Sequence, residues 1–265
     1  MEIIKESIHT TMSEPTPAPS HRLDPLGDGI SSLELIRVSG SDIDVVNAAR
    51  VSFGKDCTVL EERDKQLIRY LMQHMHTSPL EHNQLSFRVK CPLFTARQWM
   101  RHRMNSYNEI SYRYVKAPLE FYIPQQWRGQ HKNNRQASSG QFENAELLAA
   151  YKQSLDQSRA TYETLLEQGV CRELARGILP VCTYTEFIFT CNLHSLINFL
   201  RLRLHEGVQY EIKVYAQGLL ELALPHFPVS LTAWQESHAP QAAVAQALKE
   251  EKELQQLLKM EKKTQ

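Results

Sequence analysis

Hydrophobic residues repeat with two different periods along this chain of 265 residues. In the segment 85–89, leucine, phenylalanine and valine alternate with serine and arginine, which predicts a half-buried strand. In the segment 61–75, one predicted helical face collects Leu67, Ile68, Leu71, Met72 and Met75. Helices and strands are therefore expected to share one fold.

Turn and capping residues bound the other predicted elements. In chain order we expect a strand near 33–38, a helix from the capping-box-like pair Ser41 and Asp44 to about Arg50, a helix starting at Pro92, a polar loop over 125–140, a long helix over 142–168 closed by Gly169, a strand around 184–190 and two helices across 193–224. This order predicts an α+β fold in which mixed helices pack on a central sheet that contains antiparallel pairs.

The two ends of the chain differ in composition from the middle. Residues 1–30 are marked by proline and glycine, as in EPTPAPS and DPLGDG, and are expected to form a disordered tail. Residues 231–265 include the charged stretch KEEKELQQLLKMEKK and are expected to form a peripheral helical extension. We therefore expect one functional domain over residues 31–230.

Charge and cysteine content limit the expected partners and compartment. Because 30 basic residues balance 30 acidic ones, general attraction to nucleic acid or an anionic membrane is not expected, and small anions are the expected partners. The 5 cysteines lack CxxC spacing, which favours reduced thiols and a cytoplasmic location. We expect no signal peptide and no membrane span, because no apolar run reaches roughly 18–20 residues.

Positive charge is concentrated in residues 101–114, with the sequence RHRMNSYNEISYRY. Arginine binds phosphate or carboxylate through paired hydrogen bonds and keeps its charge, so a bound anion is the expected counter-charge. If the helix from Pro92 continues this far, Gln98 and Arg101 share one face and Arg103 points nearly the opposite way. The segment is then expected to contact two different ligands or two subunits.

Three other interpretations of these polar clusters remain open. The arginines can form a solvated, charged helix end. They can also hold the phosphates of single-stranded nucleic acid while bases stack on Trp99, Tyr107, Tyr112 and Tyr114. His74, His76 and His82 suggest a metal site, but the first two would project apart on a helix, and no metal ligand is predicted.

The arginine-rich segment also carries a family signature. Arg101, His102 and Arg103, followed by seven residues and then Ser111, resemble the signature of the flavin-dependent thymidylate synthases. Other segments resemble this family in the same order: AARVSF at 48–53, EERDKQLIRYLM at 61–72, HTSPLEH at 76–82, ARQWMRHR at 96–103, EFYIP at 120–124, RELARGILP at 172–180 and SLINFLRLR at 195–203. The resemblance covers residues 33–230 approximately.

The resemblance implies an activity, a set of cofactors and an assembly. It implies reductive methylation of dUMP to dTMP, with 5,10-methylenetetrahydrofolate as carbon donor, NADPH-reduced FAD as hydride source, and tetrahydrofolate released. It also implies the fold of that family, the absence of a cysteine nucleophile, and a homotetramer whose active sites are shared between subunits. A relative that acts on a different pyrimidine is the alternative enzyme.

The resemblance further implies roles for individual residues. Arg203 is the implied catalytic residue, a fixed cation beside the pyrimidine ring. The residues implied for dUMP binding are Gln98, Arg101, Glu109, Ser111, Tyr112, Arg113, Arg176 and Arg203. The residues implied for FAD or folate binding are His76, Ser78, Arg101, His102, Arg103, Glu109, Asn192, His194 and Asn198.

Some of these residues also have a purely structural interpretation. Arg203 or its neighbour Arg201 can extend to the surface or pair with Glu206. Glu109 can simply hold nearby arginines in place. Asn198, inside the apolar stretch LINFL, is expected to be buried and to need partners for its amide.

Arg176 lies in the largely apolar stretch ELARGIL, where an unpaired charge is costly, and can pair with Glu173 or Glu186. Two positions depart from the family pattern: His194, where many relatives carry arginine, and Val208, where relatives commonly carry histidine. Because histidine is shorter than arginine and often neutral near pH 7, these departures bear on ligand affinity more than on the type of reaction.

Overall fold

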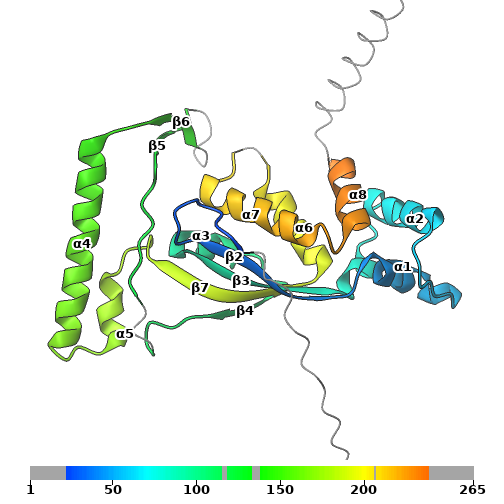
Figure 1. Cartoon of the computed structure of the whole chain (residues 1–265), viewed down its shortest axis with the longest axis horizontal. Helices are drawn as coiled ribbons and strands as arrows, with labels where there is room; N and C mark the ends of the chain where they lie inside the picture. The colour runs from blue at the N-terminus through cyan, green and yellow to red at the C-terminus, as the bar shows by residue number, and fades with distance from the viewer. Residues whose placement is uncertain (1–21, 115–117, 133–137, 206, 239–265) are drawn as a thin grey trace, which may run out of the picture.

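The computed structural model describes residues 22–114, 118–132, 138–205 and 207–238. Its centre is a five-stranded antiparallel sheet in the order β1-β2-β3-β7-β4 (Figure 1). The strands of this sheet are β1 (Arg22–Leu23), β2 (Ser32–Ser39), β3 (Gln84–Pro92), β4 (Ser106–Glu109) and β7 (Tyr184–Cys191). A second sheet pairs β5 (Trp127–Gln130) with β6 (Ser138–Phe142).

The helices pack along the sheet and extend the molecule at both ends (Figure 1). They are α1 (Asp42–Arg50), α2 (Glu62–Gln73), α3 (Leu93–Trp99), α4 (Ala145–Glu167), α5 (Arg172–Ala175), α6 (Leu193–Arg203), α7 (Tyr210–Ala223) and α8 (Pro228–His238), with short 3-10 turns η1 (Val51–Phe53), η2 (Ser78–Glu81) and η3 (Arg176–Ile178). The elements α1, α2 and α8 group at one end, and α4 stands at the other. The predicted α+β class with antiparallel pairing is confirmed.

The alternation that predicts a strand over residues 85–89 is explained by the pairing of β3 with β7. Phe87 lies opposite Phe189 and Val89 lies opposite Phe187, and all four side chains are fully buried. Trp99, the last residue of α3, packs edge-on against both phenylalanines of β7, with ring centroids 5.5 Å apart. This aromatic contact fixes the end of α3 on the sheet, next to the arginine-rich segment.

The structure decides one open point, corrects one sequence prediction and adds one strand. The helix that begins near Pro92 does not continue to Arg103 but ends at Trp99. The expected loop over 125–140 contains strands of the β5–β6 hairpin, whose residues are mostly polar and show no hydrophobic alternation. The arginine-rich segment contains β4, which forms the edge of the sheet beside β7. These differences arise because α3 ends early and because β4, β5 and β6 are strands through pairing with a partner strand, which a local hydrophobic pattern does not show.

Both ends of the described chain contact the core. Leu26, which follows β1, is buried, and so are Leu231 and Trp234 of α8. Ordered contacts therefore occur before residue 31 and after residue 230, while residues 1–21 and 239–265 lie outside the described part of the chain. The division into a tail, a functional domain and an extension stays a prediction. Within the described segments, no helix has both the length and the apolar composition needed to cross a membrane.

Asp42 connects α1 to the beginning of α8. Its side chain is 2% exposed. Its carboxylate accepts hydrogen bonds from the backbone N–H of Val229 (2.8 Å), the backbone N–H of Ser230 (3.0 Å) and the Ser230 hydroxyl (2.5 Å). Free N–H groups at a helix start need acceptors, and the helix dipole favours a negative charge there. Asp42 therefore acts as the cap of a helix distant in sequence.

Replacing Asp42 with alanine is expected to lower the free energy of unfolding by about 3 kcal/mol, because one buried and one part-buried backbone N–H group lose their acceptor. Urea denaturation at one fixed protein concentration measures this loss. Asp42→Asn keeps one acceptor oxygen and should lose clearly less. Equal stability of the alanine variant and the unmodified protein would show that the carboxylate does not hold α8.

Candidate active site

The arginine-rich segment leaves α3 in a turn and then enters β4. The backbone N–H of His102 donates to the carbonyl of Trp99 (3.0 Å), and the Tyr107 hydroxyl donates to the carbonyls of Trp99 and His102 (3.2 and 2.8 Å). Because the helix has ended at Trp99, the condition under which Arg101 and Arg103 would occupy opposite helical faces is not met. Both are exposed side chains in a turn that the core holds in place.

The aromatic residues proposed as stacking platforms for nucleic-acid bases serve other purposes. Trp99 is fully buried. Tyr107 stacks on Phe189, with ring centroids 5.5 Å apart. Of the four aromatic residues, Tyr114 is the one that is largely exposed, at 74%. The nucleic-acid interpretation therefore loses most of the surface that it requires.

A pocket of about 560 Å³ lies beside β4, β7 and η3. It is lined by Leu93, Arg97, Glu109, Ile110, Ser111, Tyr112, Glu173, Arg176, Gly177, Leu179, Val181, Thr183 and Thr185. We refer to it as the Arg176 pocket. It brings together four residues implied for dUMP binding, namely Glu109, Ser111, Tyr112 and Arg176.

Arg176 is exposed at this pocket and has no ion-pair partner among the described residues. The two carboxylates that could have neutralised it are engaged elsewhere: Glu173 pairs with Arg113 (3.1 Å), and Glu186 pairs with Arg88 (2.8 Å). The helix around Arg176 is also too short and open to bury it, which corrects the expectation of a costly buried charge. Arg176 is thus available for an anion.

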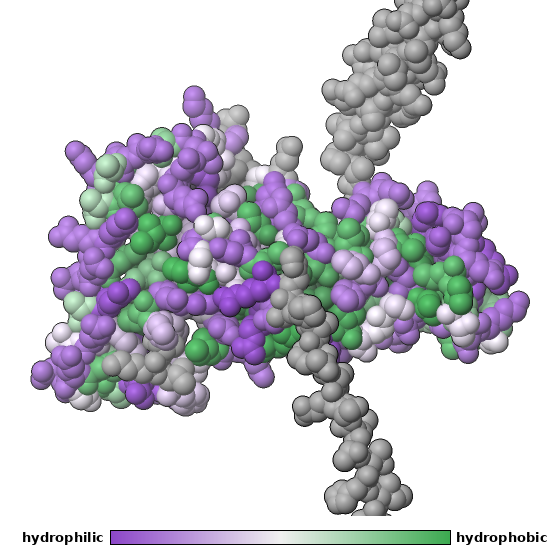
Figure 2. Space-filling view, viewed as in Figure 1, coloured by the Kyte–Doolittle hydropathy of each residue, from purple (hydrophilic) through white to green (hydrophobic). Residues whose placement is uncertain are grey.

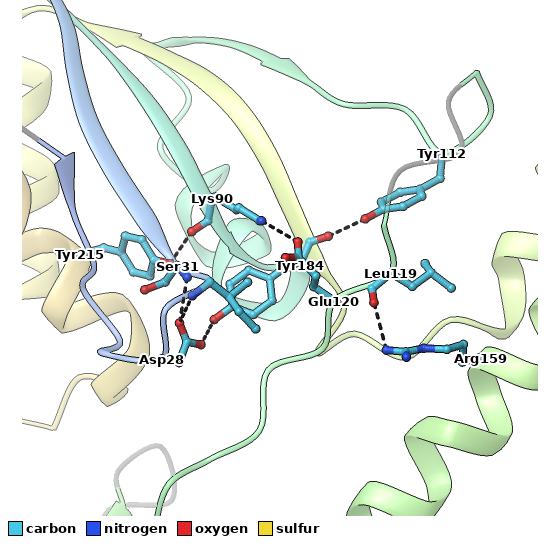
Figure 3. A network of polar contacts seen from close by, with 10 residues as sticks. Asp28, Ser31, Lys90, Tyr112, Leu119, Glu120, Arg159, Tyr184 and Tyr215 are labelled. Atoms are coloured by element: carbon cyan, nitrogen blue, oxygen red, sulfur yellow. Dashed lines mark hydrogen bonds and ion pairs between the residues drawn. The ribbon is translucent and has the colours of Figure 1, made fainter. Parts of the chain in front are cut away.

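β7 and its neighbours fix two walls of the Arg176 pocket. The Tyr112 hydroxyl donates to the carbonyl of Tyr184 (2.8 Å), and the Tyr184 hydroxyl in turn donates to Asp28 (Figure 3). Burial raises the pKa of Tyr112 to about 12. The Thr185 hydroxyl donates to Glu109 (2.6 Å). Tyr112 therefore lines the pocket with its ring, and within the described chain Glu109 binds a threonine and no arginine.

A smaller pocket of about 210 Å³ lies at the start of α6. It is lined by Glu81, His102, Arg103, Met104, Asn105, Asn192, His194, Ser195 and Asn198. We refer to it as the α6 pocket. Five of its residues are among those implied for FAD binding: His102, Arg103, Asn192, His194 and Asn198.

Several polar side chains of the α6 pocket are already oriented. Asn192 caps α6 by accepting a backbone N–H of the first turn (2.8 Å), and Nδ1 of His194 lies 2.9 Å from the Glu81 carboxylate. Asn198 is half-buried, not fully buried as expected. The side-chain oxygen of Asn105 is buried and has no hydrogen-bond partner within the described residues. Sequence reasoning missed Glu81 and Asn105, although Glu81 lies within HTSPLEH.

Arg203 points inward from the last turn of α6. Its Nε donates to Nε2 of His102 (3.2 Å), and its Nη2 donates to the backbone carbonyl of Gln98 (3.0 Å). Burial and the adjacent guanidinium lower the pKa of His102 to about 4, so this histidine is neutral near pH 7 and can accept the hydrogen bond. Arg201 is exposed. Of the two arginines, Arg203 therefore faces the site. Glu206, the ion-pair partner considered for either arginine, lies outside the described residues.

A line of side chains connects Gln98 to a buried carboxylate. Nε2 of Gln98 donates to Oε1 of Gln209, and Nε2 of Gln209 donates to Oε2 of Glu211 (2.9 Å). Oε1 of Glu211 accepts from Arg128 (2.6 Å) and from the Tyr122 hydroxyl (2.9 Å). Burial favours a higher pKa for Glu211, but the hydrogen bonds from Arg128 and Gln209 together lower it below its ordinary value. Sequence reasoning did not assign roles to these partners of Gln98.

Within one chain, six of the eight residues implied for dUMP binding fall into two groups: Glu109, Ser111, Tyr112 and Arg176 at the Arg176 pocket, and Gln98 with Arg203. Arg97 lines the Arg176 pocket. Gln98, the next residue, contacts Gln209 through its side chain, and its backbone carbonyl accepts a hydrogen bond from Arg203. Consecutive residues of a helix point about 100° apart. Among the described residues of one chain, no hydrogen bond or ion pair joins Gln98 or Arg203 to Ser111 or Arg176.

Two residues implied for cofactor binding, His76 and Ser78, are exposed and line neither pocket. The rings of His74 and His76 both lie against Tyr70, 6.2 Å from one another, because α2 ends at Gln73; the prediction that they point apart is wrong. The described residues contain no cluster of three or more His, Cys, Asp or Glu side chains placed to hold a metal ion.

All five cysteines are free thiols. Burial raises the pKa of Cys57, Cys91, Cys182 and Cys191 above its ordinary value. A thiol with a raised pKa is largely protonated near pH 7 and is a weak nucleophile. These four cysteines therefore lack the property that an attacking thiolate needs. Cys171 is exposed and, like Arg113, lines a separate surface pocket.

The fold is an antiparallel sheet flanked by two pockets whose arginine and amide side chains suit anionic, polar ligands. Comparison with known sequences gives the family: residues 34–229 match the family described as "Thymidylate synthase complementing protein". The chain is 44% identical over 204 residues to a flavin-dependent thymidylate synthase of Thermus thermophilus, covering 77% of this chain and 75% of that one. It is 42% identical over 205 residues to the corresponding protein of Kosmotoga olearia, covering 76% and 89%.

A solved structure agrees with these sequences. The UMP/dUMP methylase PolB of Streptomyces cacaoi, bound with 5-Br dUMP, superposes with a TM-score of 0.73 and 34% identity over 79% of this chain and 97% of that one. Its complex with 5-Br UMP gives a TM-score of 0.70 and 33% identity over 78% and 94%. This chain belongs to the family of the flavin-dependent thymidylate synthases.

Proposed function

We propose that this chain is a flavin-dependent thymidylate synthase that methylates dUMP at C5. The one-carbon unit would come from 5,10-methylenetetrahydrofolate and the hydride from FAD that NADPH has reduced. The observation that carries this proposal is the setting of Arg203. Two hydrogen bonds fix its guanidinium, which leaves three of its five N–H donors for a ligand.

Arg203 can stabilise the negative charge that develops on a pyrimidine ring when its C5 becomes nucleophilic. A fixed cation is effective because it needs no reorganisation during the reaction. His102 supports this role by staying neutral, since a second positive charge 3.2 Å away would repel the guanidinium. Burial lowers the pKa of Arg203 itself, but an arginine remains charged near pH 7.

The Arg176 pocket is suited to the phosphate of the nucleotide. Arg176 lacks an ion-pair partner among the described residues. The Ser111 oxygen accepts the backbone N–H of Arg113 (3.3 Å), which leaves its hydroxyl proton free to donate. A phosphate provides the acceptor oxygens for both groups. Arg101 and Arg113 would add further donors from the same segment.

The α6 pocket is suited to part of FAD. The unsatisfied oxygen of Asn105 offers an acceptor to a ligand, and Arg103 offers charge for a phosphate. At about 210 Å³ the pocket is smaller than the roughly 300–1,000 Å³ typical of cofactor sites, so the remaining contacts would come from other subunits. When bound and reduced, FAD would supply the hydride that completes the methyl group. His194 would contact it through an imidazole already held by Glu81.

We further propose a homotetramer whose active sites combine residues of different subunits. Within one chain, neither Gln98 nor Arg203 lines the Arg176 pocket, which supports this assembly. So do the exposed large hydrophobic side chains around α4, α5 and the segment after them: Phe142, Leu147, Leu174, Ile178 and Val181. In Figure 2, hydrophobic patches lie among hydrophilic ones on this side of the molecule. Such patches commonly mark subunit contacts.

The test is tritium release from dUMP labelled at C5, in the presence of 5,10-methylenetetrahydrofolate and NADPH, with and without added FAD. We expect release that depends on FAD and proceeds after thiol alkylation. Absence of release from folded, flavin-containing protein would refute the proposed reaction. The resemblance to a UMP/dUMP methylase makes UMP the second candidate substrate, and competition between labelled dUMP and unlabelled UMP separates the two.

A further inference from the structure

The line from Glu211 to Gln98 fixes the direction of two amide groups. An ionised carboxylate can only accept hydrogen bonds, so Gln209 must turn its NH₂ toward Glu211. The Gln209 carbonyl oxygen then faces Gln98 and can only be met by the Gln98 NH₂. These are the observed contacts. The orientation of both amides therefore follows from the buried carboxylate.

The side-chain oxygen of Gln98 therefore faces away from Gln209 and is the acceptor that this side chain offers to a ligand. No hydrogen bond to this oxygen is present among the described residues, and the backbone carbonyl of the same residue holds Arg203. An acceptor at this position can pair with the N3–H of uracil. Cytosine carries an unprotonated N3 there, and two acceptors would face each other without a proton.

We propose that Glu211 is a positioning residue that sets base specificity: acting through Gln209, it makes Gln98 present an acceptor and so selects uracil over cytosine nucleotides. This inference rests on the proposed function, in which Gln98 contacts the pyrimidine of dUMP. Glu211 is well placed for this role because it is 2% exposed. Arg128 and Tyr122 hold its other oxygen, so the carboxylate cannot rotate away from Gln209.

Glu211→Gln should reverse the line of hydrogen bonds. Arg128 and Tyr122 both donate to Oε1, so they keep the oxygen of the introduced amide on their side and turn its NH₂ toward Gln209. Gln209 must then present its oxygen to that NH₂ and its own NH₂ to Gln98. Gln98 would flip in turn and present a donor to the base. A donor matches N3 of cytosine and opposes N3–H of uracil.

The experiment measures the dissociation constants of dUMP and dCMP by calorimetry on the purified, FAD-containing protein. For the unmodified protein we expect dUMP to bind at least about a hundredfold more tightly than dCMP. Glu211→Gln is expected to lower this ratio at least tenfold, with weaker dUMP and stronger dCMP binding. Tyr122→Phe removes one hydrogen bond from the far oxygen of Glu211 and should keep the original ratio.

Gln209→Leu provides a second route if Glu211→Gln fails to fold. This substitution removes the hydrogen bonds that link Gln98 to Glu211 without touching the buried ion pair of Glu211 and Arg128. The Gln98 amide is then free to rotate, so the preference for dUMP over dCMP should fall without reversing. An unchanged ratio in a folded variant of either kind would overturn the inference. If the unmodified protein releases no tritium and binds no dUMP, the proposed function fails instead, so the two failures are distinguishable.

Discussion

Arg203→Ala is expected to reduce tritium release from dUMP by at least roughly 10²–10³-fold, the effect of losing one fixed group that stabilises developing charge. Flavin should stay bound, because the α6 pocket is lined by other side chains. The measurement compares turnover with the flavin absorbance of the purified protein. Normal turnover in this variant would remove Arg203 from the mechanism.

Arg201→Ala is the matched control for this experiment. Arg201 lies two residues earlier on the same helix, but its side chain is exposed, so its removal should leave turnover within a few fold. Arg203→Lys adds a second control because it keeps the charge. A lysine ammonium cannot reproduce the planar pair of hydrogen bonds to His102 and Gln98. Only partial recovery is therefore expected if geometry matters as well as charge.

Local patterns in the sequence were sufficient for the elements that bury one face. The alternation around Phe87 and the helical repeat of α2 both led to confirmed elements. The β5–β6 hairpin and β4 escaped prediction because their residues are mostly polar and none is buried, so no hydrophobic period marks them. Their strand structure comes from pairing with another strand, which a local pattern does not show.

In the candidate site, too, some residues could be proposed from the sequence and others could not. The signature residues and Arg203 could be proposed because the family resemblance marks them, and the structure places His102 against Arg203. The partners that orient them could not be read from the sequence. Gln98 and Gln209 are separated by 111 positions, and a buried Glu211 is recognisable only after Arg128 is brought to it by the hairpin.

Mixing two inactive variants is expected to restore activity if the active sites are shared. Arg203→Ala damages the group that contains Gln98, and Arg176→Ala damages the Arg176 pocket. When both chains are co-expressed, some sites of the proposed mixed assembly receive an intact Arg203 from one chain and an intact Arg176 from another. Random assembly gives about a quarter of such sites, so tritium release should rise from near background to roughly a quarter of the normal value.

The matched negative control co-expresses Arg203→Ala with Gln98→Ala. Both substitutions fall in the group that one chain contributes, because Arg203 is hydrogen-bonded to Gln98 of the same chain. Every site then carries one defect or the other, and release should not exceed the mean of the two single variants. Restored activity in the first mixture together with none in the second would require a site built from two chains. Two different affinity tags verify that mixed assemblies have formed. If the first mixture then stays inactive, either Arg176 and Arg203 act within one chain or Arg176 is dispensable. The turnover of Arg176→Ala alone decides between these two explanations, since loss of a dispensable arginine leaves turnover unchanged.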